Sequence, residues 1–146
     1  MANLGNTVID GNLTITGSNV VFNSERSYAF HQWNSIGLAV STSTSIEHSL
    51  TIETTGRPVF VFCSGDNNPT SETAWVQVTI YRDGTKINYQ IAESHGSSWN
   101  IPFSLTYLDM VPAGSHTYRV VINCGGGSSN LCENELEGPK FGVFEI

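Results

Sequence analysis

Charged residues are scarce in this sequence, and basic ones most of all. Only 13% of the 146 residues are charged, and six Lys and Arg stand against thirteen Asp and Glu, for a formal net charge of −7. Binding to nucleic acid or to anionic lipid needs grouped cations, and the few cations here form no cluster, so the composition disfavours both partners. Low charge with many Ser, Thr, Asn and Gly residues is typical of a rigid all-β surface protein rather than of a helical enzyme.

Long apolar runs are missing as well. No stretch approaches the roughly 20 residues that a bilayer-spanning helix requires, so we expect no membrane insertion. Residues 1–16 have neither the basic start nor the continuous apolar core of a signal peptide. We therefore expect the protein to be made in a cytoplasm and to stay soluble.

The sequence has three cysteines and four scattered histidines, with no CxxC pair, so it predicts no zinc site and no cofactor. Cys63 lies in the apolar run 59–63 and is typical of a small buried hydrophobic residue. Cys124 and Cys132 flank a seven-residue loop that a disulfide could close. The spacing alone does not decide whether the bond forms, and a chain without a secretion signal is expected in a reducing compartment, which favours the reduced pair.

The first part of the chain has a six-residue repeat, with glycines at positions 5, 11 and 17. Each unit is a short run of Val, Ile and Thr closed by a turn-forming residue, which is typical of short strands in a β-repeat. Such strands bury little on their own. The sequence therefore predicts an N-terminal β arm over residues 1–23 that packs on other copies or on another protein; a frayed tail with one hairpin is the alternative. Its expected contact residues are Val8, Ile9, Leu13, Ile15, Val20, Val21 and Phe22.

Residues 24–37 follow as a mixed connecting segment without a helical pattern. Tyr28, Phe30 and Trp33 are spaced two and three residues apart. We expect this segment to lie across the main body with these aromatic side chains as its anchors.

The remaining residues, 38–146, predict about eight strands separated by turn signals roughly every ten residues, without a helix, which indicates a β-sandwich or jelly roll. The apolar run 59–63 predicts a central strand, and the polar stretch 64–71 predicts a loop. Asp83-Gly84 predicts a two-residue hairpin turn. Pro102 predicts an edge position or a bulge, and the glycine-rich stretch 125–130 predicts a hairpin tip. The final run, 140–146, is apolar enough to predict burial in a sheet.

The sequence gives no sign of catalysis. Glu93, Ser94 and His95 lie side by side in a polar turn, without the strand–turn–helix elbow or the oxyanion hole that a nucleophilic serine requires. The acidic and amide residues at 66–68 do not match a calcium-binding loop. We therefore expect no catalytic residue and no metal ligand.

Residues 106–118 read TYLDMVPAGSHTY, and a Gly/Ser/Asn loop and a terminal FGVFEI follow them. This combination resembles the C-terminal half of C1q/TNF-like jelly rolls, and most of all the versions that end bacteriophage virion proteins. The GNLTITG at 11–17 looks like the glycine-punctuated leader of phage tail-fibre-like proteins. The resemblance covers most of the chain from residue 38 onward together with the leader.

The resemblance implies a homotrimeric head with aromatic or aliphatic residues packed along a three-fold axis, and it transfers no catalytic residue. The candidates for the trimer interface are residues at alternate positions of the predicted strands, which share one face. His48 also suits a hydrogen-bonded core position. These candidates are His48, Tyr107, His116 and Tyr118.

The length of the leader discriminates between the functions that such a head could have. At no more than about 3.6 Å per residue, some 20 residues reach about 70 Å at most, so the head cannot stand far from its particle. We expect a non-enzymatic virion surface protein, anchored by its arm to another virion protein, of the capsid-decoration or head-fibre type. The alternative is the head of a tail fibre that binds a host receptor or glycan. An enzyme such as a polysaccharide depolymerase would need paired carboxylates, and the spacing offers none.

Overall fold

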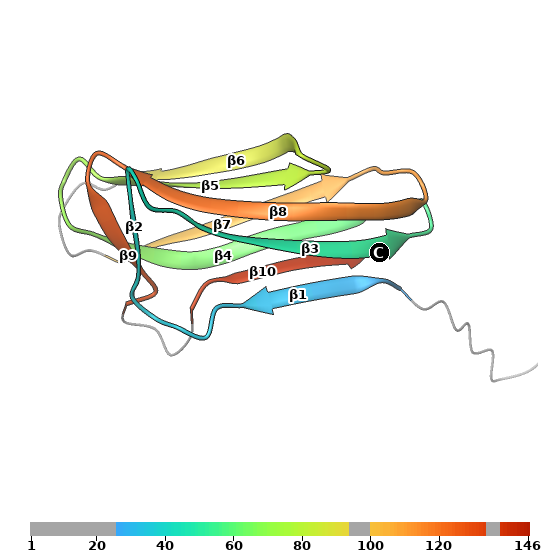
Figure 1. Cartoon of the computed structure of the whole chain (residues 1–146), viewed down its shortest axis with the longest axis horizontal. Coiled ribbons are helices and arrows are strands. Elements are labelled where there is room, and N and C mark those ends of the chain that lie inside the picture. Colours follow the sequence, from blue (N-terminus) through green and yellow to red (C-terminus); the bar gives the residue numbers. More distant parts are fainter. Residues whose placement is uncertain (1–25, 94–99, 134–137) are drawn as a thin grey trace, which may run out of the picture.

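In the computed structural model, two antiparallel β-sheets pack face to face (Figure 1). The structure describes residues 26–93, 100–133 and 138–146, and in these residues the regular structure is all strand. The expected all-β sandwich is therefore confirmed. The strands are β1 (Tyr28–Gln32), β2 (Leu38–Ser41), β3 (Ile46–Thr54), β4 (Val59–Pro69), β5 (Trp75–Arg82), β6 (Thr85–Glu93), β7 (Ile101–Asp109), β8 (Gly114–Gly125), β9 (Ser128–Leu131) and β10 (Lys140–Glu145).

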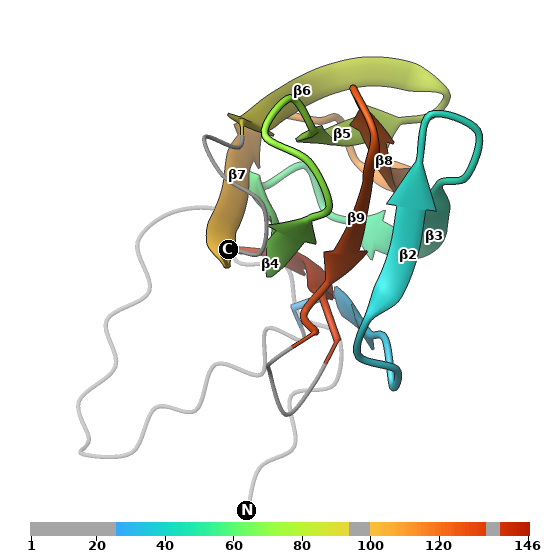
Figure 2. The ribbon, with the colours of Figure 1, turned by 90° about the vertical axis from the view of Figure 1, so that its left-hand side faces the viewer.

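The strand order is jelly-roll-like. One sheet, which we call the β4 sheet, runs β1-β10-β4 with β7 on the other side of β4, and β9 and β2 extend it from the far end of β4. The second, the β8 sheet, runs β3-β8-β5-β6. From β2 to β9 the chain passes from one sheet to the other at every connection except the β5–β6 hairpin, which is how jelly rolls wrap their two sheets. Figure 2 shows β2 and β9 crossing one end of the sandwich.

The core lies between the sheets and follows the period of two in the strand sequences. Alternate residues of the central strands are fully buried, as Val61 on β4, Ile80 on β5 and Val120 on β8 illustrate. Each such side chain stabilises the fold by roughly 1.5–3 kcal/mol. The last strand is buried as predicted, because β10 lies between β1 and β4.

The Asp83-Gly84 turn is confirmed in its details. Asp83 has a φ of 49° and Gly84 a φ of 82°, and two successive positive φ values belong to the hairpin turn that fits the twist of its strands. β5 and β6 pair on either side of it, from Trp75 with Glu93 to Arg82 with Thr85. The edge position predicted from Pro102 is also found, since the ladder of β7 is with β4.

The predicted loop at 64–71 is largely wrong. β4 continues to Pro69, and its polar second half pairs with β7 and then with β9. Ladders with neighbouring strands satisfy the backbone groups of this stretch, so the tertiary context overrides its turn-like composition. The stretch 125–130 is not a hairpin tip either, because β8 belongs to one sheet while β9 pairs with β2 and β4 in the other.

The expected connecting segment, residues 24–37, also differs from the prediction. Residues 28–32 form β1, an edge strand whose five residues pair with β10. The sandwich therefore begins with β1 and not at residue 38. The predicted N-terminal arm, residues 1–23, lies outside the described residues.

Candidate functional site

The outer side of the β4 sheet carries a row of large apolar side chains. The strand register aligns one residue from each of four neighbouring strands, since each pair lies directly opposite in its ladder. The first row consists of Tyr28, Phe144, Phe60 and Leu108. The second row consists of Phe30, Gly142, Phe62 and Thr106. The third row is polar and consists of Gln32, Lys140, Ser64 and Ser104.

We call the rings of the first two rows the aromatic face: Tyr28, Phe30, Phe60, Phe62 and Phe144. The rings contact one another, with centroids 5.9 Å apart for Phe62 and Phe144 and 6.2 Å apart for Tyr28 and Phe144. Both pairs are nearly parallel, within the range in which aromatic side chains attract each other. Nevertheless Tyr28 is 72% exposed, Phe30 47% and Phe60 36%. A contiguous exposed apolar patch of this kind is typical of an interaction surface.

Gly142 lies in the middle of the aromatic face. A Cβ placed on this residue would fall on the ring of Phe62 and only 2.7 Å from the ring of Phe144. The missing side chain therefore lets the rings of two strands close over the backbone of β10, which is a common reason for a glycine inside a strand.

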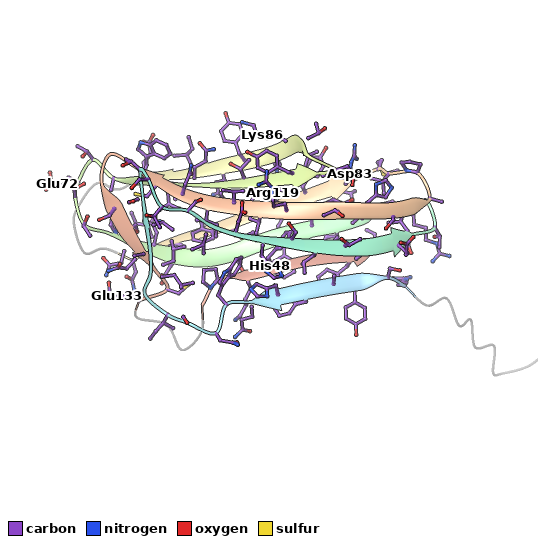
Figure 3. All side chains as sticks on the ribbon, viewed as in Figure 1. His48, Glu72, Asp83, Lys86, Arg119 and Glu133 are labelled. Atoms are coloured by element: carbon purple, nitrogen blue, oxygen red, sulfur yellow. The ribbon has the colours of Figure 1, made fainter. Side chains whose placement is uncertain are left out.

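The outer side of the β8 sheet has a different character. There the guanidinium of Arg119 lies over the ring of Tyr81 at 4.6 Å and the ammonium of Lys86 over the ring of Tyr89 at 4.3 Å. Arg119 also donates to Glu47 at 3.0 Å. Figure 3 shows Lys86 and Arg119 on this side of the sandwich. The aromatic side chains of this face are thus paired with cations, whereas those of the β4 sheet stack on one another.

The predicted interface residues lie at several places in the fold. Tyr118 is wholly buried, and its hydroxyl donates to Asp109 at 3.0 Å. Tyr118 is therefore a core residue, and the prediction that it forms an interface is wrong. Burial first, and then the hydrogen bond to Asp109, raise the pKa of Tyr118, so the phenol stays a neutral donor. Tyr107 faces inward and packs against the core.

The two histidine candidates have partners within the chain. His48 stacks on His31 of β1, with the ring centroids 3.5 Å apart. His116 Nδ1 lies 2.8 Å from a carboxylate oxygen of Asp83. This hydrogen bond raises the pKa of His116 and lowers that of Asp83. None of the four candidates belongs to the aromatic face.

The three predicted arm anchors divide between two sides of β1. Trp33 packs against the core as an anchor would. Tyr28 and Phe30 instead point outward and form part of the aromatic face. The sequence did carry a signal for this face, because Phe60 and Phe62 alternate with valines in the run 59–63. The same run predicts a central strand, which β4 is, but its pattern does not reveal that one side of it is exposed.

Cys124 and Cys132 are free in this structure, so the disulfide that their spacing left possible is not formed. Cys124 is buried, and its thiol is 3.5 Å from the carbonyl oxygen of Gly125. The sulfur of Cys132 lies instead beside Gly65. Burial, followed by the nearby Cys132, raises the pKa of Cys63 to about 12. All three are therefore inert core residues in this structure.

The metal, membrane and polar-turn expectations concern other parts of the chain. Within residues 26–93, 100–133 and 138–146, no group of three or more His, Cys, Asp or Glu side chains is placed to hold a metal ion. In the same part of the chain, no helix is long and apolar enough to cross a bilayer. Ser94 and His95 of the polar turn, and all the predicted contact residues of the arm, lie outside the described residues.

The comparisons with known proteins provide information on the fold only. No protein-family model matches the chain, and no curated protein matches its sequence. Among solved structures, dimeric latent PorU from Porphyromonas gingivalis is similar at 8% identity with a TM-score of 0.51, over 82% of this chain and 13% of that one. A structure of infectious bursal disease virus, Gt strain, is similar at 16% identity with a TM-score of 0.32, over 84% of this chain and 35% of that one.

The chain thus spans only a small part of PorU and about a third of the viral chain. At these identities the PorU similarity concerns the fold, and the viral similarity is too weak to carry an argument. The fold and the candidate site together define a jelly-roll-like β-sandwich with one aromatic outer face.

Proposed function

We propose that the chain is a non-enzymatic virion surface protein whose jelly-roll head assembles as a homotrimer through the aromatic face. The observation that carries this proposal is the exposed stack of rings on the β4 sheet, in contrast to the cation-paired face of the β8 sheet. Covering those rings with the same surface of neighbouring copies would remove them from water, and closed symmetry is the usual outcome for a self-associating soluble protein. The resemblance to C1q/TNF-like heads of phage virion proteins supports the choice of a trimer.

In this proposal the N-terminal residues hold the head on its particle by binding another virion protein of the capsid or tail. We favour capsid decoration or a head fibre as the place of the head. The proposal assigns the protein no cofactor, no nucleic-acid partner and no membrane insertion. Its place is the virion surface, after synthesis in a host cytoplasm.

A pair of matched variants tests the aromatic face. Phe60→Asp puts a charge among the rings of the β4 sheet, while Tyr89→Asp makes a similar change on the exposed face of the β8 sheet. In sedimentation velocity, we expect the molecular mass of Phe60→Asp to fall from that of a trimer to that of a monomer. The mass of Tyr89→Asp should stay that of a trimer. The proposal fails if both variants keep the mass of the unmodified protein, or if that protein is itself a monomer.

The alternative is a tail-fibre head that binds a host receptor or glycan. The outer side of the β8 sheet favours it, because tyrosine rings flanked by cations and amides are suited to stacking against sugars and bonding to their hydroxyls. Cryo-microscopy of virions with the protein labelled separates the two functions. Density on the capsid supports decoration, and density at the tail tip supports the alternative.

A further inference from the structure

Two histidines form a stacked pair between the sheets. The rings of His31 and His48 are nearly parallel, with an interplanar angle of 7° and centroids 3.5 Å apart. Trp33 lies edge-on to both rings, with its centroid 4.6 Å from that of His31 and 6.0 Å from that of His48. Figure 3 shows His48 at the edge of the sandwich where β1 and β3 lie side by side.

The pair connects two edge strands that belong to different sheets. β1 is the outermost strand of the β4 sheet and forms its ladder with β10, and β3 is the outermost strand of the β8 sheet. His31 lies on the inner side of β1, directly opposite Phe141 of β10. The two imidazoles therefore join the sheets where no strand ladder does.

Among the described residues, the surroundings of the pair offer little to balance charge on the rings. Phe141 faces the pair from β10, and Val120 of β8 is the residue opposite His48. Glu47, the neighbour of His48, points to the other side of β3 and accepts from Arg119. Lys140 is level with Gln32 on the outer side of the β4 sheet. Burial, and after it the neighbouring His48, lower the pKa of His31, and no carboxylate is among the causes.

We propose that His31 and His48 form a pH-sensitive latch that holds β1 on the sandwich. The rings stack while at most one of them is charged. Two imidazolium ions in face-to-face contact repel each other at short range, with no room for water between them. When both are protonated, β1 separates from β3 and is held by its ladder with β10 and by the ring contacts of Tyr28 and Phe30.

The direction in which pH changes the opening of β1 follows from the pKa of His31. Its pKa is lowered in the closed state, so opening takes up a proton once the pH is below the ordinary value of about 6.5. The opening equilibrium then grows about tenfold for each pH unit and each proton taken up. Between pH 7.5 and pH 5, uptake of one proton by His31 raises the opening equilibrium constant by at most roughly 30-fold.

This latch works within one chain, so it does not depend on the proposed trimer. It has a consequence for the aromatic face, however, because Tyr28 and Phe30 belong to the strand that opens. If the trimer exists, acid should weaken it through β1. If the protein is a monomer, the opening of β1 remains measurable.

Hydrogen exchange of the full chain tests the latch. Peptides covering residues 27–33 and 75–82 are followed by mass spectrometry at pH 7.5 and pH 5, with rates corrected for the chemical effect of pH. We expect the corrected exchange of the β1 peptide to rise severalfold at pH 5, up to a limit of roughly 30-fold for one proton, while the β5 peptide changes little. A β1 peptide that responds no more than the β5 peptide overturns the proposal.

Variants separate the stacked pair from a general effect of acid. His31→Phe and, independently, His48→Phe keep a flat ring at the site and remove one titrating group, so the acid response of the β1 peptide should disappear in each. His116→Gln removes a histidine outside the pair and should leave that response unchanged. A response that persists in a folded His31→Phe or His48→Phe protein contradicts the latch, as does its loss in His116→Gln.

Discussion

The buried tyrosine of β8 provides the sharpest test of the packing. Tyr118 donates to Oδ2 of Asp109 at 3.0 Å, and Arg82 donates to Oδ1 of the same carboxylate at 2.7 Å. Asp109 is only 4% exposed, so water cannot replace a lost donor. The substitution Tyr118→Phe keeps the ring and removes the hydroxyl. It should lower the free energy of unfolding by about 1–3 kcal/mol, the cost of leaving a buried charged acceptor short of a partner.

In a protein of this length, a loss near 2 kcal/mol lowers Tm by roughly 4–8 °C. Urea unfolding followed by tryptophan fluorescence measures the loss of unfolding free energy. Both proteins are compared at equal protomer concentration, because assembly also contributes to stability. Tyr89→Phe removes an exposed hydroxyl and is the control, with an expected change within about 0.5 kcal/mol. The reasoning is refuted if Tyr118→Phe is as stable as the unmodified protein. It is also refuted if the main effect of Tyr118→Phe is on assembly, since that would make Tyr118 an interface residue.

Three further predictions concern other parts of the sandwich. Gly142→Ala should lower the urea midpoint, because its Cβ displaces the ring of Phe62; an unchanged midpoint would mean that the rings are not closed over β10. The hydrogen bond to Asp83 raises the pKa of His116 in the folded protein. This bond therefore stabilises the fold fully below the pKa of His116 in the unfolded chain, and the stabilisation is lost as pH rises through its pKa in the folded protein. His116→Gln should therefore destabilise the protein more at pH 5 than at pH 9, and urea titrations showing equal losses would contradict this. A thiol reagent should modify Cys63 and the other two cysteines only after unfolding, and a thiol count below three in denaturant would reveal a disulfide.

Much of the fold could be predicted from the sequence because local pattern and tertiary context agree there. The alternation in β3, β5 and β8 decided which side chains are buried, and Asp83-Gly84 determined its turn from two residues alone. The second half of β4 could not be predicted, since its polar residues are held as a strand by neighbours that come much later in the chain. β1 could not be predicted for the same reason: its ladder is with β10, more than a hundred residues away.

The candidate site was harder to predict, because it depends on the register between strands. Tyr28, Phe60 and Phe144 are far apart in the sequence, and only the ladders of β1, β10 and β4 place them in one row. A strand with apolar residues on both sides is usually buried on both sides. Here one side of β4 faces the core, and the other carries the aromatic face. The stacked histidines likewise come from strands in different sheets, which no spacing along the chain reveals.

The central claim is that the head assembles through its own aromatic face. Light scattering on the intact chain and on a chain shortened to begin at Ser24 tests it most directly. The account predicts that both form trimers, with the intact chain at three times its 15.9 kDa protomer mass. A monomeric intact chain would contradict the claim, and so would a trimer that is lost when the residues before Ser24 are removed.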